Sequence, residues 1–371
     1  MQDKAALGPV VVAIPAKDEV ERIAACLDAL NAQIGARVDH IVLLVNNSTD
    51  ATAAIARAFI PDPQTRVHVI ERDFPPGEAN AGHARSLAMD LAAELAGPDG
   101  VLMTTDADGV VDPDWVAAAL DELRAGADVV AGWVDLHPIE WGQIPIALHE
   151  DDARECAYDA LSDEIHARLD VDPADPMPRH TQHSGASIAV TAAAFARCGG
   201  VPLVPSGEDR ALIAALRRVD ARVRHSPAVH VSVSGRITGR SPGGMADTIQ
   251  RRMGKPDPFL DDRLEPATDC VRRALCRAEL RQAYLDPARD RSALAARLDL
   301  PAMELTAMLH TRHFGQAWDR VEAASPALRR NLVPVWDLPT QMLVAESILR
   351  PSPGGLADPA GNLSLESEGL A

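Results

Sequence analysis

Apolar runs alternate with amphipathic segments along the first 135 or so residues. Short runs rich in Val, Ile and Leu predict buried strands, and they lie at 10–15, 41–45, 66–70, 100–105 and 127–132. Between them, apolar positions at helical spacing predict helices, such as the Ala-rich segment that ends at Gly97 and Pro98. Strict alternation of strand and helix, with strands apolar throughout, indicates an α/β protein with a parallel sheet covered on both faces.

The pattern changes after residue 135. We expect an amphipathic helix at 145–170, a strand at 183–190, a helix that begins near Ser206, and a strand at 222–234. The Gly-rich, basic stretch at 235–248 predicts a mobile loop, and a helical region extends to about residue 350. The composition from residue 351 onward predicts a disordered tail. We therefore divide the chain into 1–240, 241–350 and 351–371.

The composition of the chain excludes some classes of partner and of cellular location. The net charge is −18 and only 3% of residues are aromatic, which argues against nucleic acid as a partner. No apolar stretch approaches the roughly 20 residues of a membrane span, and the first residues contain no apolar core of a signal peptide. The five cysteines are scattered and form no C-x-x-C pair, which predicts reduced thiols in the cytoplasm.

Two carboxylates follow the fourth predicted strand, in the sequence "VLMTTDADG". In open α/β sheets ligands bind at the carboxyl ends of the strands, and "PAKDE" and "NNSTD" reach the same edge. Asp106 and Asp108 would repel one another when buried, and Mg²⁺ or Mn²⁺ would remove that repulsion while binding a substrate diphosphate. The alternative is a solvated turn, because Asp and Gly are common turn residues.

Four motifs occur in order: "IPAKDE" (14–19), "NNSTDAT" (46–52), "DAD" (106–108) and "GED" (207–209). The order and spacing of these four motifs resemble those of a family 2 glycosyltransferase. The resemblance covers residues from about 8 to about 240. The resemblance implies the GT-A fold, an α/β architecture with a mixed, mainly parallel sheet flanked by helices. It does not cover the last hundred or so residues, which we expect to form a C-terminal helical extension.

The resemblance also implies roles for residues on the donor side. Asp108 would ligate the metal, and Asp106 would contact the ribose or the sugar. Asn46 stands where the family usually has an Asp near the base, so UDP and GDP both remain open as carriers. The other nucleotide-sugar contacts implied or inferred are Pro15, Ala16, Glu19, Arg85, Arg236 and Arg240. Arg236 and Arg240 belong to the Gly/Arg loop, for which a solvated loop is the alternative.

On the acceptor side, the resemblance implies that Asp209 is the general base and that Glu208 orients the acceptor hydroxyl. The alternative is a capping box, in which Ser206 caps the helix and the helix dipole stabilises Glu208 and Asp209 in the first turn. His183, Gly185, Ala186 and Trp133 are the candidate acceptor contacts. A further metal ligand would be His230, or else His225.

These residues together predict a metal-dependent, inverting transferase that moves a sugar from a nucleotide-diphosphate sugar to an acceptor hydroxyl. A homodimer is one possible assembly. The rival functions are a retaining transferase of the glucosyl-phosphoglycerate-synthase type and a nucleotide-sugar-binding protein without turnover. A dinucleotide dehydrogenase would need a G-x-G-x-x-G turn after a strand, and none follows "VVVAIP".

Overall fold

The computed structural model describes residues 7–239 and 244–350. The strands are β1 (Val10–Ala16), β2 (His40–Asn46), β3 (Arg66–Arg72), β4 (Val101–Thr104), β5 (Val110–Val111), β6 (Val129–Leu136), β7 (Ile188–Thr191) and β8 (Val223–Val233). The helices of the first two thirds are α1 (Ile23–Asn31), α2 (Thr52–Ala58), α3 (Ala81–Ala96), α4 (Trp115–Ala125), α5 (Pro138–Trp141), α6 (Ile146–Leu169), α7 (Ala192–Cys198) and α8 (Glu208–Arg218). They are followed by α9 (Met245–Gly254), α10 (Ala267–Leu285), α11 (Ser292–Arg297), α12 (Ala302–Met308), α13 (Phe314–Ala324), η1 (Pro326–Leu328), η2 (Val335–Asp337) and α14 (Leu338–Leu349).

Within the described residues, the strands form one sheet of order β3-β2-β1-β4-β7-β6-β8-β5. β1 pairs in parallel with β2 and β4, β2 with β3, and β6 with β8. β7 runs antiparallel to β4 and β6, and β5 runs antiparallel to β8. The predicted mixed, mainly parallel sheet flanked by helices is therefore confirmed. The strand expected at 183–190 begins only at Ile188, and the residues before it form a loop.

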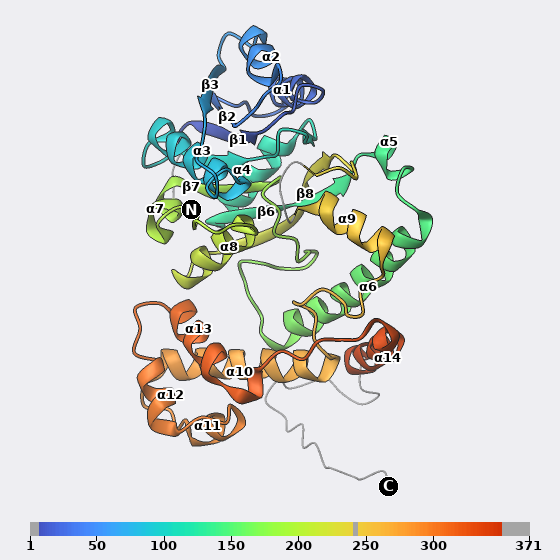
Figure 1. Ribbon diagram of the computed structural model, residues 1–371. Helices are drawn as coiled ribbons and strands as arrows, with labels where there is room; N and C mark the ends of the chain where they lie inside the picture. The colour runs from blue at the N-terminus through green and yellow to red at the C-terminus, as the bar shows by residue number, and fades with distance from the viewer. Residues whose placement is uncertain (1–6, 240–243, 351–371) are drawn as a thin grey trace.

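Helices pack against the sheet (Figure 1), and each face of the sheet carries its own apolar core. Alternate residues of a strand point to opposite faces, so Val12 and Ile14 pack with α1, α2 and α4 while Val11 and Ala13 pack with α3, α7 and α8. Burial of one such Val or Ile side chain contributes about 1.5–3 kcal/mol. The near-continuous apolar strands of the sequence thus reflect burial on both faces, which leaves the strand ends as the place for polar chemistry.

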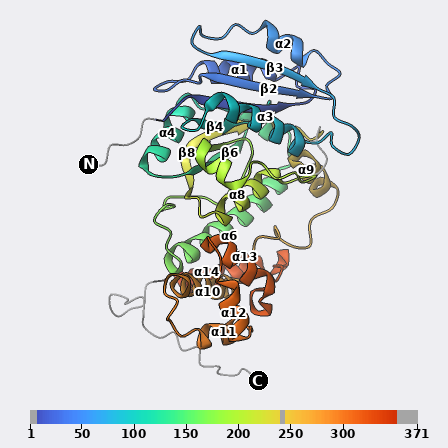
Figure 2. The ribbon, with the colours of Figure 1, turned by 90° about the vertical axis from the view of Figure 1, so that its left-hand side faces the viewer.

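The C-terminal helices form a separate layer below the sheet (Figure 2), with two further apolar cores. The long helix α6 reaches down to this layer and packs against α10 and α14, where its Tyr158 and Ile165 are buried. The predicted helical region is therefore present, and α6 belongs to its packing although it precedes β7 and β8. None of the described helices combines the length and the apolar character needed to cross a membrane.

The predicted Gly-rich loop after β8 is partly helical. The stretch 235–248 was predicted to be a loop throughout, but Met245 already begins α9. An amphipathic pattern of only ten residues with Gly at both ends gives too weak a helical signal, which is why the prediction was wrong there. Arg240 and the predicted tail at 351–371 lie outside the described residues.

Candidate active site

The loops after β1 and β2 are fastened to each other at the carboxyl edge of the sheet. The backbone N–H of Asp18 donates to Ser48 Oγ at 2.9 Å, and that of Glu19 donates to Thr52 Oγ1 at 2.8 Å. Asp18 and Asn47 both adopt positive φ, 53° and 48°, a region that non-glycine residues seldom occupy. The two motifs predicted to meet at this edge therefore do meet.

Pro15, Ala16 and Asn46 lie at the ends of these strands. Pro15 and Ala16 are in register with Leu44 and Val45 of β2, and Asn46 is in register with Arg72 of β3. Ala16 and Asn46 are buried. They lie at the carboxyl ends of β1 and β2, and their contact with a nucleotide stays a prediction.

Arg236 connects the β1 loop with the acidic motif. Its Nη1 and Nη2 lie 2.9 and 2.7 Å from the two carboxylate oxygens of Glu19, and Nη2 lies 3.2 Å from Asp108 Oδ2. Burial, followed by the neighbouring charge of Asp106, raises the pKa of Asp108 to about 7. The same carboxylates raise the pKa of Arg236 despite its own burial. A cation is thus already held where Asp106, Asp108 and Glu19 converge.

Glu140, which belongs to no recognisable sequence motif, holds the segment that carries Arg236. Its carboxylate accepts a hydrogen bond from Gly235 N–H at 2.6 Å and forms an ion pair with Arg22. Burial alone would raise the pKa of Glu140, but bonds from Ser234, Arg22 and Gly235 outweigh burial and lower it. A single acidic residue in the short helix α5 forms no recognisable sequence pattern, so only the fold reveals its contacts with Gly235 and Arg22.

Arg85 is buried beneath the site and bound through all of its guanidinium nitrogens. Nη2 contacts Asp106 Oδ1 at 2.6 Å, Nε contacts Glu208 Oε1 at 3.0 Å, and Nη1 donates to Thr104 Oγ1 and Gly185 O at 2.7 and 2.9 Å. Burial opposes its charge, but Asp106 and Glu208 raise its pKa. Arg85 therefore ties the acidic motif to the start of α8, and its expected contact with the donor stays a prediction.

Asp209 lies in the first turn of α8, and both of its oxygens accept backbone hydrogen bonds. Oδ2 accepts from Gly185 N–H at 3.0 Å and Oδ1 from Arg210 N–H at 2.7 Å. Burial raises the pKa of Asp209 above its ordinary value. The helix begins after Gly207 at φ 73°, without a side-chain cap, so the capping box at Ser206 is wrong. Glu208 is buried against Arg85 rather than capping.

The candidate acceptor residues converge on the loop before β7. His183 Nε2 lies 2.9 Å from His225 Nε2. Gly185 is packed so closely that a Cβ there would lie 2.4 Å from Arg85 Cζ, and Ala186 is fully buried. Trp133 Nε1–H donates to Asp135 Oδ2 at 2.8 Å. The fold thus brings Gly185 into contact with Asp209, and His183 lies two residues earlier in the same loop. Contact of these residues with an acceptor stays a prediction.

The two histidines considered as metal ligands have other partners. His230 lies 3.0 Å from Asp112 through Nδ1 and 3.2 Å from Asp135 through Nε2. His225 contacts Asp175 through Nδ1 and His183 through Nε2. Neither set of contacts includes Asp108, so ligation by His230 or His225 stays a prediction.

Comparison with known proteins gives a family for the first half of the chain. Residues 11–174 match the family model "Glycosyl transferase family 2". No curated protein sequence matches the chain.

Several solved structures have similar folds at low sequence identity. A mannosyltransferase from Pyrobaculum calidifontis, in complex with GDP-Man and Mn²⁺, is 18% identical, with 95% of this chain and 78% of that chain covered and a TM-score of 0.44. TarS of S. aureus with UDP-GlcNAc is 14% identical, with 91% and 89% covered and a TM-score of 0.44. Glucosyl-3-phosphoglycerate synthase from Mycobacterium tuberculosis, with Mn²⁺, UDP and phosphoglyceric acid, is 18% identical, with 68% and 81% covered and a TM-score of 0.39.

The family match spans β1 to β6, and with them the "IPAKDE", "NNSTDAT" and "DAD" motifs, whose loops the fold brings to one edge of the sheet. Residues 11–174 therefore match glycosyl transferase family 2, and this match supports a transferase.

Proposed function

We propose that the protein is a metal-dependent, inverting glycosyltransferase that moves a sugar from a nucleotide-diphosphate sugar to an acceptor hydroxyl. The observation that supports this most is the Asp108 carboxyl, which is buried beside Asp106 and Glu19 with a pKa raised to about 7. Three carboxylates this close together, with Asp108 and Glu19 largely removed from water, favour a bound cation. In the structure the guanidinium of Arg236 supplies part of that charge.

The residues at this edge fit a divalent metal. Asp108 offers a carboxylate oxygen, the ligand type that Mg²⁺ and Mn²⁺ prefer. When bound, such an ion would neutralise charge on the departing diphosphate. Arg236, released from Asp108, would bind phosphate oxygens as a planar fork. Glu19, Asn46, Pro15 and Ala16 would enclose the nucleoside.

Asp209 would remove the proton from the acceptor hydroxyl as its oxygen attacks the anomeric carbon and the bond to the diphosphate breaks. Gly185 N–H and Arg210 N–H fix both oxygens of the carboxylate. Its raised pKa makes it a stronger base than an ordinary Asp. Glu208, which is bound to Arg85, would orient the acceptor hydroxyl.

We also propose the cytoplasm as the location. The five cysteines are all free, as is usual where thiols stay reduced.

The test is a thermal-shift titration with UDP or GDP, with and without Mn²⁺. We expect one nucleotide to raise the melting temperature only when the metal is present. Asp108→Asn should abolish that shift, whereas Asp262→Asn, at an exposed position before α10, should retain it. A nucleotide shift that is independent of metal in the unmodified protein would contradict the metal role.

Product analysis separates the rival functions. Transfer with inversion at the anomeric carbon, followed by NMR, supports the proposal. Retention would favour a retaining transferase of the glucosyl-phosphoglycerate-synthase type. Nucleotide binding without donor turnover, across Mn²⁺, Mg²⁺ and varied acceptors, would favour a binding protein.

A further inference from the structure

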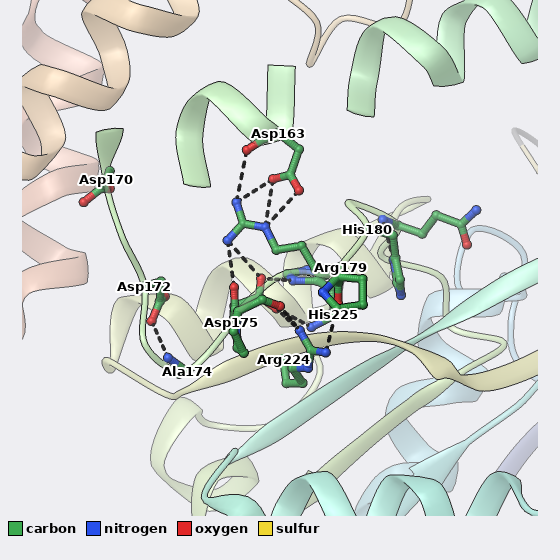
Figure 3. Close-up of polar contacts among 12 residues, drawn as sticks. Asp163, Asp170, Asp172, Ala174, Asp175, Arg179, His180, Arg224 and His225 are labelled. Atoms are coloured by element: carbon green, nitrogen blue, oxygen red, sulfur yellow. Dashed lines mark hydrogen bonds and ion pairs between the residues drawn. The ribbon is translucent and has the colours of Figure 1, made fainter. Parts of the chain in front are cut away.

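A carboxylate and two histidines form a continuous hydrogen-bonded chain that leads to the acceptor side of the site. Asp175 Oδ2 lies 2.7 Å from His225 Nδ1, and His225 Nε2 lies 2.9 Å from His183 Nε2. Asp175 Oδ1 also accepts from the backbone N–H of His225 at 2.8 Å. Figure 3 shows Asp175 between Arg179, Arg224 and His225, at the start of β8. His183 is a candidate acceptor contact, whereas no role has been assigned to Asp175.

The charges around Asp175 keep it ionised. Arg179 Nη1 lies 3.6 Å from Oδ2 and Arg224 Nη1 lies 3.4 Å from Oδ1. Burial would raise the pKa of Asp175, but its bonds with His225 and the charge of Arg179 lower it. Arg179 is itself held by the α6 residue Asp163, at 2.6 and 2.8 Å. The chain therefore starts from a fixed carboxylate that only accepts hydrogen bonds.

An ionised carboxylate at one end sets the proton positions along the chain. Asp175 requires a proton on Nδ1 of His225, and an uncharged His225 then presents a lone pair at Nε2. Two imidazole nitrogens 2.9 Å apart need one proton between them, and in the arrangement with both imidazoles uncharged His183 carries that proton on Nε2. The remaining nitrogen of His183, Nδ1, is then an unprotonated hydrogen-bond acceptor.

The surroundings hold His183 uncharged. Burial is the main cause that lowers the pKa of His183, to about 2, and the cations Arg217, Arg263 and Arg210 act in the same direction. Arg210 and Arg217 belong to α8, and Arg263 precedes α10. The side chain is still partly exposed, and within the described residues no hydrogen bond reaches its Nδ1.

The loop that carries His183 is also the loop of the proposed base. Two residues further on, Gly185 donates its N–H to Asp209 and gives its carbonyl to Arg85. Gln182 Oε1 accepts from Val134 N–H of β6 at 2.8 Å, and Thr181 Oγ1 accepts from Arg263 at 2.6 Å. The loop is thus held from the sheet, from α8 and from the C-terminal region, so the position of His183 is fixed relative to Asp209.

We propose that Asp175 and His225 are positioning residues that fix His183 as an uncharged hydrogen-bond acceptor for a second hydroxyl of the acceptor substrate. This rests on the proposed function, and it adds the class of acceptor: a polyhydroxy compound with a free hydroxyl beside the one that Asp209 activates. A deoxy or O-methyl group at that second position would leave the Nδ1 lone pair unpaired, which polar sites reject strongly.

The first test reads the protons directly and needs neither donor nor acceptor. In ¹⁵N-histidine-labelled protein at pH 8, long-range ¹H–¹⁵N spectra distinguish Nε2–H from Nδ1–H, and His183→Asn assigns the signals. We expect His183 as the Nε2–H form in the unmodified protein. A His183 with its proton on Nδ1, or with a proton on both nitrogens, would overturn the proposal.

Variants of Asp175 then test whether this residue is the cause of the Nε2–H form of His183. In Asp175→Leu, His225 loses the partner of its Nδ1–H, so we expect the chain to reverse and His183 to gain Nδ1–H. Asp163→Asn is the matched control, because Asp163 also pairs with Arg179 but does not touch His225. It should leave the spectrum of His183 unchanged. An unchanged spectrum in folded Asp175→Leu, or in Asp175→Asn if the first variant does not fold, counts against the role of Asp175.

The second test measures transfer to methyl glycosides and glycerol with a fixed donor. We expect Asp175→Leu to lower kcat/KM for the acceptor about tenfold or more while the KM for the donor stays the same, and Asp163→Asn to change neither. Equal losses in both variants, or a change in the donor KM, would contradict a positioning role. If the unmodified protein transferred to no acceptor, the proposed function and the acceptor part of this inference would fall together, while the spectra would still decide the proton positions.

Discussion

Nη2 of Arg236 lies 3.2 Å from Oδ2 of Asp108, while the same guanidinium is paired with both oxygens of Glu19. The three residues come from the segment after β8, the loop after β4 and the loop after β1. A guanidinium in this position partly neutralises the carboxylates that would hold a divalent ion. Arg236 and the metal therefore compete for Asp108.

Removal of this competitor should strengthen metal binding. Arg236→Gln should raise the affinity for Mn²⁺ in the absence of nucleotide about fivefold, because a partly exposed ion pair contributes roughly 1 kcal/mol. Titration calorimetry or the EPR signal of free Mn²⁺ measures this. Arg37→Gln, at an exposed arginine paired with Asp39, is the control and should change nothing. Weaker Mn²⁺ binding in Arg236→Gln would show that Arg236 assists the metal instead.

Metal binding should depend on pH through Asp108. Its pKa is raised to about 7, and only the ionised carboxylate can act as a ligand. Protonation therefore weakens binding below pH 7, and the affinity for Mn²⁺ should rise about tenfold between pH 6 and pH 8. Calorimetry in several buffers checks this. A constant affinity over that interval would mean that Asp108 is ionised throughout or is not a ligand.

Loss of the proposed base should separate binding from transfer. Asp209→Asn keeps the shape of the side chain but cannot accept a proton, so transfer should fall by about 10²–10⁴-fold. The metal-dependent thermal shift with nucleotide should remain, because Asp209 contacts Gly185 and Arg210 rather than the acidic motif. Radiolabelled donor assays measure the first quantity. Transfer at the parental rate would exclude Asp209 as the base.

Arg85 should be important for stability. Arg85→Met would leave Glu208 buried without its partner, and loss of one side of a buried ion pair costs about 3–5 kcal/mol. Urea unfolding followed by circular dichroism gives the free energy of unfolding. The double variant with Glu208→Gln should recover part of the loss, since residue 208 then carries no buried charge. A double variant as unstable as the sum of the two single variants would argue against coupling between them.

Gly185 should not tolerate a side chain. A Cβ there would lie 2.4 Å from Arg85 Cζ and 2.5 Å from Arg85 Nη2, so Gly185→Ala must displace a guanidinium that is held on all sides. We expect a loss of about 1–3 kcal/mol in the free energy of unfolding. Gly142→Ala is the control, because a Cβ there meets nothing within 4 Å and φ is −67°. Equal stability of both variants would contradict the packing described.

Much of the sheet could be predicted from the sequence, because the positions of the apolar runs reflect burial on both faces. β1, β2 and β3 begin and end within two residues of the predicted runs. The strand direction could not be predicted: β7 runs antiparallel because of its connections, and its apolar residues look like those of a parallel strand. The two-residue strand β5 is too short to give any pattern.

In the candidate site, too, some features could be predicted from the sequence and others could not. The sequence by itself determined which polar motifs follow which strands, since the ends of parallel strands meet at one edge. Only the tertiary structure decided that Arg236 contacts Asp108, that Arg85 binds Glu208, and that His183 contacts His225. Helix and strand periods are local properties of the backbone, whereas these contacts join residues far apart in the chain and depend on strand order and helix packing.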